Sequence, residues 1–154
     1  MRIEIFSRLF SFAGGHKGRA LQFFVMRRLF YSIIRWPRSH GFGVQSPFAF
    51  RFVTEVVRSR RIPEHLPSGF YEQFSTKDKR LLSFYGRLYD FLIREKGLER
   101  VYVIEGIHDD AESYSLWMEI IQDEKVVVSF DLYDCGVLFF DGKLPKFNYK
   151  VMLR

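Results

Sequence analysis

The sequence predicts an α/β protein in which helices pack on a small mixed sheet. In the C-terminal half, segments with apolar residues at helical spacing alternate with short apolar runs that are typical of strands. Turn-forming residues, chiefly Gly and Asp, separate these segments. The chain has 154 residues, of which 47% are apolar, so we expect one compact domain with a packed core.

We expect the N-terminal part of the chain to be mainly helical. Ile3–Phe12 is predicted to form a short helix, and Arg19–Trp36 a longer one whose apolar side chains cover a broad arc. A third helix should run from Pro47 to about Ser59, because Ser46 is a favourable N-cap and Pro suits the first helical position. The following residues, 62–74, contain prolines and a glycine and should be irregular.

The C-terminal half should contain two helices and four strands. The first helix, Lys77–Lys96, is predicted to begin after Thr76 as its N-cap. The second, Ala111–Gln122, should be capped by Asp109 or Asp110, and Asp109 with Glu112 has the spacing of a capping box. The strands are predicted at Val101–Glu105, Lys125–Leu132, Gly136–Phe140 and Phe147–Leu153.

The order of these elements suggests how the sheet is connected. The strand Val101–Glu105, the helix after it and the strand Val126–Leu132 are expected to form a right-handed βαβ unit. The last strands are expected to pair antiparallel at the C-terminal edge. We divide the chain into a basic, helix-rich segment, residues 1–75, and a small α/β unit, residues 76–154, which together should form one domain.

Charge is distributed unevenly along the chain. Met1–Arg61 has twelve Lys and Arg against two acids, a formal charge of +10, whereas Ile62–Arg154 has twelve against sixteen, a formal charge of −4. A basic, aromatic-rich front can meet nucleic acid, an anionic lipid surface or the acidic back of the same chain, or it can be a solvated face around an apolar core. The candidate basic surface consists of Arg27, Arg28, Arg35 and Arg38.

The sequence lacks the motifs of several common chemistries. A single cysteine, Cys135, excludes a disulfide framework and a Cys-based zinc site, and we expect it to have a structural role. No two of the four histidines are three or four residues apart, and neither a P-loop nor a serine-nucleophile elbow is present. We therefore expect no metal site. The N-terminus does not resemble a secretory signal and no run of about 18 apolar residues occurs, so we expect a cytoplasmic protein.

One cluster of chemically active side chains remains, at the end of the strand Val101–Glu105. Glu105, His108, Asp109 and Asp110 follow this strand at its C-terminal end, where open α/β sheets bind ligands. Three carboxylates and an imidazole could hold a divalent cation or act as acid and base. The alternative is that an aspartate only caps the next helix while Glu105 and His108 are solvated.

Three stretches resemble a bacterial group of class I S-adenosylmethionine-dependent methyltransferases. Residues 40–50, HGFGVQSPFAF, resemble the H-G-x-H-S-P-F-V-F/Y segment that precedes the methyltransferase core, and this makes His40 and Ser46 candidate ligand contacts. Residues 101–120 resemble a late strand of the family with its acidic pair and the following helix. Residues 125–140, KVVVSFDLYDCGVLFF, are similar to the closing hairpin. The resemblance implies a partial Rossmann-like sheet, here of about three or four strands.

The departures from the family pattern concern the methyl-donor site. The family holds its donor with a strand, a glycine-rich loop and an acidic residue on the next strand. The chain between residues 50 and 101 is too short for those strands and helices. The acidic pair is replaced by Glu105-Gly106, and the second histidine of the front motif by Gln45.

A second alignment would make residues 101–106 the strand and start of the donor loop. That loop needs further glycines, whereas residues 107–110 provide none and their side chains would block a close backbone approach. We therefore favour the alignment with the late strand.

These observations predict a non-catalytic remnant of a methyltransferase fold that acts as a binding or assembly protein, with no catalytic residues and no cofactor. Loss of half a sheet leaves an exposed edge, which a second copy or a protein partner would cover. The alternative is an active methyltransferase of minimal design that uses S-adenosylmethionine. A peripheral membrane or nucleic-acid binder is a weaker alternative, because core packing is the simpler use of the helix Arg19–Trp36.

Overall fold

The computed structural model describes residues 2–6, 28, 30–31, 46–95, 98 and 100–153, and for residues 2–6 it describes the backbone alone. The predicted helix Ile3–Phe12 is wrong where it can be compared, because Arg2–Phe6 forms strand β1. Its sequence, RIEIF, alternates apolar and charged residues with the period of a strand, and pairing with a neighbouring strand satisfies its backbone. The rest of that helix and most of Arg19–Trp36 lie outside the described residues.

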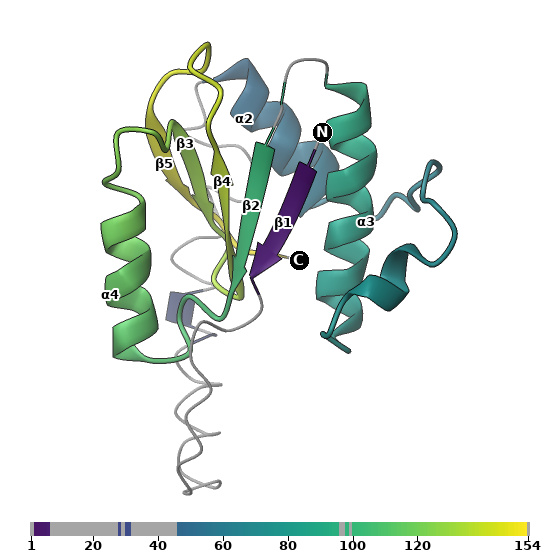
Figure 1. Ribbon diagram of the computed structural model, residues 1–154, viewed down its shortest axis with the longest axis horizontal. Helices are drawn as coiled ribbons and strands as arrows, with labels where there is room; N and C mark the ends of the chain where they lie inside the picture. The colour runs from purple at the N-terminus through teal and green to yellow at the C-terminus, as the bar shows by residue number, and fades with distance from the viewer. Residues whose placement is uncertain are drawn as a thin grey trace, which may run out of the picture.

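Five strands form one mixed sheet in the order β1-β2-β4-β3-β5 (Figure 1). β1 is parallel to β2 and β5 is parallel to β3, whereas β4 is antiparallel to both of its neighbours. The predicted α/β class, with helices packed on a small mixed sheet, is confirmed. The four later strands are β2 Arg100–Glu105, β3 Val128–Asp131, β4 Cys135–Phe139 and β5 Phe147–Lys150.

The expected pairing of the strands differs from the structure in two respects. β2 and β3 are not adjacent, because β4 lies between them and places Val137 opposite both Val103 and Phe130. The antiparallel pairings are therefore at the centre of the sheet, and the C-terminal edge strand β5 is parallel to its neighbour. Every residue of β4 is buried, which favours a position where strands and helices cover it on all sides.

The helix after Ser46 begins as predicted. Ser46 Oγ accepts a hydrogen bond from Ala49 N (3.5 Å), and helix α2, Pro47–Phe52, starts with its proline at the first turn. The helix continues as a π-helix, η1, over Val53–Val57, whose Val53, Val56 and Val57 are buried.

Helix α3, Lys79–Arg94, starts two residues later than predicted. Asp78 Oδ1 accepts a hydrogen bond from Arg80 N (2.8 Å) and is the N-cap, while the predicted cap, Thr76, instead accepts from Asp78 N (3.3 Å). A short 3₁₀ helix, η2, Phe70–Gln73, precedes it, and α4, Ala111–Ile120, follows β2. No helix within the described residues is both long and apolar enough to cross a membrane.

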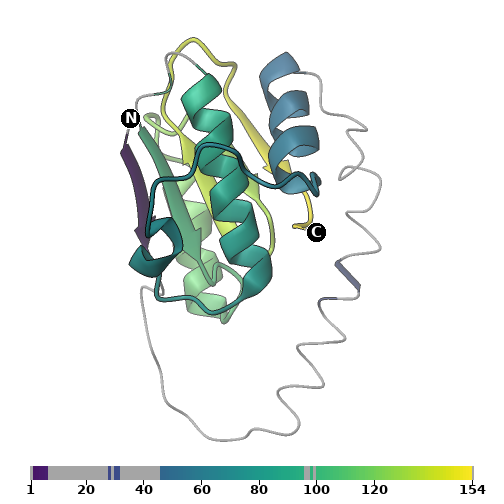
Figure 2. The same ribbon diagram turned by 90° about the vertical axis from the view of Figure 1, so that its right-hand side faces the viewer.

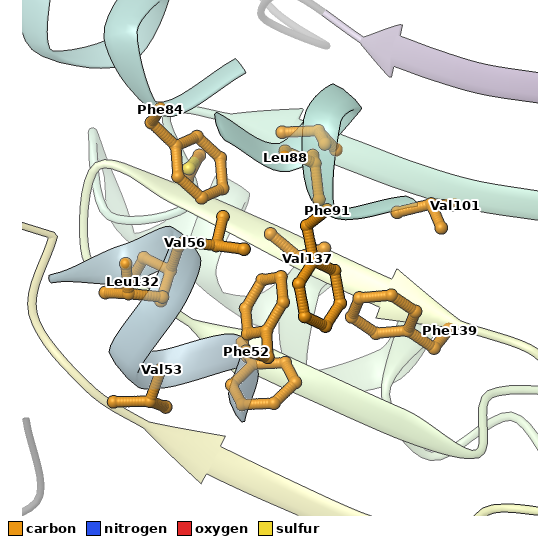
Figure 3. Close-up of a cluster of buried hydrophobic side chains, with 14 of the residues drawn as sticks. Phe52, Val53, Val56, Phe84, Leu88, Phe91, Val101, Leu132, Val137 and Phe139 are labelled. Carbon is orange, nitrogen blue, oxygen red and sulfur yellow. The ribbon is translucent and has the colours of Figure 1, made fainter. Parts of the chain in front are cut away.

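Helices cover both faces of the sheet. α2, η1 and α3 pack on one face, and α4 packs on the other (Figures 1 and 2). The larger core lies under α2 and α3, where Phe52, Phe91 and Phe139 lie close together (Figure 3). The ring of Phe52 is 4.3 Å from that of Phe130 and 5.3 Å from that of Phe139. This arrangement leaves the C-terminal ends of β1 and β2 at one end of the sheet, next to the start of α3.

Candidate functional site

A cavity of about 500 Å³ lies at the C-terminal end of β2. Three segments form its wall: the residues before and at the start of α3, the loop after β2, and the turn between β3 and β4. Two predicted site residues, Glu105 and Asp109, line it, whereas His108, Asp110 and Ser46 do not. The lining residues are Ser75, Thr76, Lys77, Asp78, Leu81, Glu105, Gly106, Asp109 and Asp134.

Glu105, the last residue of β2, is held by a tyrosine from α3. The hydroxyl of Tyr85 donates a hydrogen bond to Glu105 Oε1, and Tyr85 is 1% exposed. Burial raises the pKa of Tyr85 far above its ordinary value, and the neighbouring Cys135 and Glu105 add to the effect. Tyr85 therefore stays protonated and fixes the direction of the carboxylate. No local sequence motif links Tyr85 to Glu105, which lies 20 residues further along the chain.

The polar groups of the loop after β2 are hydrogen-bonded within the protein. Gly106 has φ of +72°, and its N–H donates to the carbonyl of Asp134 (2.9 Å). Asp109 N donates in turn to the carbonyl of Gly106 (3.0 Å). The carboxylate of Asp109 folds back over the glycine, so that a Cβ at position 106 would lie 2.6 Å from Asp109 Oδ2. The space into which a side chain at position 106 would point is thus filled by the carboxylate of Asp109, although Gly106 itself still lines the cavity.

Asp110, and not Asp109, caps α4. Asp110 Oδ1 accepts a hydrogen bond from Ser113 N (2.7 Å), and this bond holds the pKa of Asp110 below its ordinary value. The predicted capping box is not formed, because Asp109 faces Gly106. The capping interpretation is therefore correct for one aspartate of the cluster and wrong for the other.

His108 is buried and does not line the cavity. Its Nε2 lies 3.0 and 3.1 Å from the two carboxylate oxygens of Asp131, and both side chains are nearly inaccessible. The imidazole stacks between Tyr114 and Tyr133, with ring centroids 4.6 and 4.9 Å away. The expectation that His108 is solvated is wrong, and its geometry is that of an internal structural pair rather than of a ligand contact.

The turn between β3 and β4 carries the last residue of the cavity wall. Tyr133 has φ of +74°, a conformation that bulky residues rarely adopt, and Asp131 Oδ1 accepts from its N–H (3.0 Å). The next residue, Asp134, binds both guanidinium nitrogens of Arg28 at 2.8 Å and lies 3.9 Å from Arg80. Burial raises the pKa of Asp134 and outweighs the opposing charges of Arg28 and Arg80.

Of the predicted site residues in the candidate basic surface and the front motif, the structure describes Arg28 and Ser46. Arg28 is an ion-pair partner whose side chain is 25% exposed, not an open cationic residue. Ser46 serves as the cap of α2. The remaining candidates, Arg27, Arg35, Arg38 and His40, lie outside the described residues.

The chemistry of the cavity is that of carboxylates. Asp78, Glu105, Asp109 and Asp134 line it with a single cationic residue, Lys77. Asp78 and Asp134 are paired with Arg80 and Arg28. The carboxylates of Glu105 and Asp109 can accept hydrogen bonds from the hydroxyl or amino groups of a ligand. Across the ranges that the structure describes, no group of three or more His, Cys, Asp or Glu side chains is arranged to hold a metal ion. Cys135 is buried beside this site, and burial raises the pKa of its thiol well above the ordinary value.

Comparison of the chain with protein-family models, curated proteins and solved structures found no match.

Proposed function

We propose that this chain is a binding or assembly protein with no catalytic centre of its own, built on a remnant of a methyltransferase-like fold. The cavity at the end of β2 is the remnant of the family's ligand edge. Its partner is a second copy or another protein that covers an edge of the sheet.

The observation that carries the proposal is the closed loop after β2. A methyl-donor site needs backbone that a ligand can approach, whereas here the carboxylate of Asp109 lies over Gly106 and the amide of Gly106 is bonded to Asp134. The residues present therefore do not fit this cofactor.

The order of elements supports the relationship to the methyltransferase fold. The resemblance implies a late strand, a helix and a closing hairpin, and β2, α4 and the β3–β4 hairpin follow in that order. The edge strands of the sheet are β1 and β5. Edge strands with unpaired backbone groups are surfaces at which another chain can add, and this supports an assembly role.

Titration with S-adenosylmethionine by calorimetry tests the proposal. We expect no saturable heat at ligand concentrations up to about 1 mM, which corresponds to a binding free energy weaker than about −4 kcal/mol. Asp109→Ala is the informative variant, because it removes the carboxylate above Gly106 and leaves the fold of β2 unchanged. A Kd in the micromolar range for the unmodified protein would overturn the non-catalytic interpretation. Light scattering of the same samples over a range of concentrations then measures self-association.

A minimal but active methyltransferase remains the second candidate. The observation in its favour is the cavity itself, because Glu105 stands at the end of a strand where a carboxylate can hold hydroxyl groups. Micromolar binding that Glu105→Gln abolishes would support this candidate. The third candidate, a basic surface around Arg28, is weakened by the pairing of Arg28 with Asp134.

A further inference from the structure

The loop that follows η1 lies away from the cavity and combines cations with a protruding apolar residue. It comprises residues 58–63, Arg-Ser-Arg-Arg-Ile-Pro, and crosses the outer surface of α3 (Figure 2). Ile62 is 82% exposed, more than any other large apolar side chain among the described residues. A singly exposed isoleucine is ordinary on a protein surface, so its surroundings decide whether it has a role.

The loop is fastened at both ends. At its start, Arg58 N donates to the carbonyl of Val53 (3.0 Å) and ends the π-helix. At its end, Pro63 packs on α3, where a Cβ at Gly86 would lie 2.8 Å from the ring of Pro63. Beyond it, the backbone N–H and Nδ1 of His65 both contact Asp90 Oδ1, at 3.3 and 2.9 Å.

The tip of the loop is also shaped by a local hydrogen bond. Ser59 Oγ accepts from Arg61 N at 3.0 Å, which forms a tight turn just before Ile62. Ile62 is thus held outward by a defined backbone. An ordered loop presents its tip without first losing conformational freedom when it binds.

The charges around the tip are predominantly positive. Residues 56–63 contain three arginines and no acid. Of the nearest acids along the chain, Glu55 pairs with Arg94 (2.9 Å), outside the loop, whereas Glu64 pairs with Arg61 of the loop itself (2.6 Å). Arg60 is exposed and forms no ion pair within the part of the chain that the structure describes.

We propose that this loop docks on an anionic lipid surface, with Ile62 entering the interfacial region and the flanking arginines at the level of the headgroups. Cations beside an inserted apolar residue match the two layers of such a surface, because the apolar group is buried while the charges stay hydrated near phosphate. Nucleic acid would use the arginines but leave the isoleucine without a role. A protein interface needs a larger apolar centre than one residue. This proposal does not depend on the proposed function above.

Vesicle sedimentation tests the docking. With phosphatidylserine–phosphatidylcholine vesicles we expect retention that weakens as salt rises, and with pure phosphatidylcholine we expect none. Ile62→Ser should lower the partition coefficient about tenfold, because the inserted apolar surface is lost. Arg60→Ser with Arg61→Ser should lower it at least about tenfold. The matched controls are Phe147→Ser, an equally drastic change at an exposed apolar residue of β5, and Lys125→Ser with Lys143→Ser, which removes the same charge elsewhere.

A fluorescence measurement distinguishes insertion from simple charge attraction. Ile62→Trp should shift its emission to shorter wavelength on anionic vesicles and be quenched by brominated lipid, whereas Phe147→Trp should do neither. Far-ultraviolet circular dichroism confirms that each variant is folded. The proposal is overturned if Ile62→Ser binds vesicles as well as the unmodified protein, if the control variants lose as much retention as the loop variants, or if Ile62→Trp stays in water. Equal retention on DNA with no effect of Ile62→Ser would assign the loop to nucleic acid instead.

Discussion

Position 136, in the middle of the sheet, must be glycine, because the ring of Trp117 leaves no room for a larger side chain. Trp117, the one buried residue of α4, packs against Gly136 of β4, and a Cβ there would lie between 2.3 and 2.8 Å from its ring atoms. Around this contact, Ile104, Ile107 and Leu138 form the smaller core. The docking of α4 on the sheet therefore depends on one glycine.

Gly136→Ala should destabilise the protein by about 1–3 kcal/mol, because Trp117 is held on several sides and cannot yield without disturbing α4. Urea denaturation monitored by tryptophan fluorescence measures the change. Gly142→Ala is the matched control, since nothing lies within 4 Å of its added methyl, and it should change stability by no more than about 0.5 kcal/mol. Equal effects of the two substitutions would contradict the steric argument.

At this scale the sequence predicted two of the residues that line the cavity at the end of β2, Glu105 and Asp109, but not what each residue of the cluster does. Asp109 and Asp110 both have the chemistry and the spacing of a helix cap, and only the path of the loop gives the role to Asp110. His108 pairs with Asp131, a residue 23 positions away, and Glu105 with Tyr85, 20 positions away. Such partners depend on tertiary packing, which spacing along the chain does not encode.

Among the elements, those with strong periodicity were predicted well, whereas the strand β1 and the position of β4 in the sheet were not. α3, α4 and the four later strands were predicted within a few residues, because their patterns and caps are local. The strand β1 was missed, although its apolar residues alternate, because five residues give a weak signal beside an expected helix. β4 lies between β2 and β3 and is buried on both of its faces. Its sequence alone does not distinguish this central position from that of a strand in a hairpin at the edge of the sheet.

The contact between His65, which follows the loop after η1, and Asp90 of α3 should make the stability of the protein depend on pH. Burial acts to raise the pKa of Asp90, but the hydrogen bonds and charge of His65, with the charge of Arg94, outweigh it and hold the pKa below its ordinary value. A lowered pKa stabilises the folded state fully above the unfolded value of about 4, and this contribution is lost as the pH falls through the folded value.

We therefore expect Asp90→Asn to lower the free energy of unfolding most above about pH 5, with the difference from the unmodified protein shrinking toward about pH 2. Denaturation at a series of pH values measures this. His65→Ala removes the partner of Asp90, and its difference in the free energy of unfolding from the unmodified protein should shrink over the same pH range. A difference that is constant with pH would show that Asp90 acts through packing alone.

For the whole molecule, the basic front and the acidic back of the chain meet directly. The front carries +10 and the back −4, and the structure joins Arg28 of the first to Asp134 of the second. An aromatic contact accompanies this pair: the ring of Tyr31 lies 5.4 Å from that of Tyr133 and 5.7 Å from that of His108. Of the partners that the sequence allowed for the front, the acidic back of the same chain is the one observed for Arg28.

A double-mutant cycle with Arg28→Gln and Asp134→Asn should give a coupling free energy of about 1–2 kcal/mol, between the values typical of exposed and of fully buried pairs. Thermal or urea unfolding of the four proteins supplies the measurement. The side chains are 25% and 12% exposed, so moderate salt should reduce the coupling only in part. Strict additivity of the two substitutions would show that the pair contributes nothing to the joining of the two halves.

The pairing of β1 with β2 has a consequence for how the chain reaches its native state. Residue 2 lies opposite residue 100, so these two strands can pair only when the ends of a very long stretch of polypeptide come together. Contacts between such distant segments are slow to form, because the entropy of ring closure is lost before any stabilising contact is gained. Local helices such as α3 can form early, and the rate at which molecules finish folding should be governed by the arrival of their first strand.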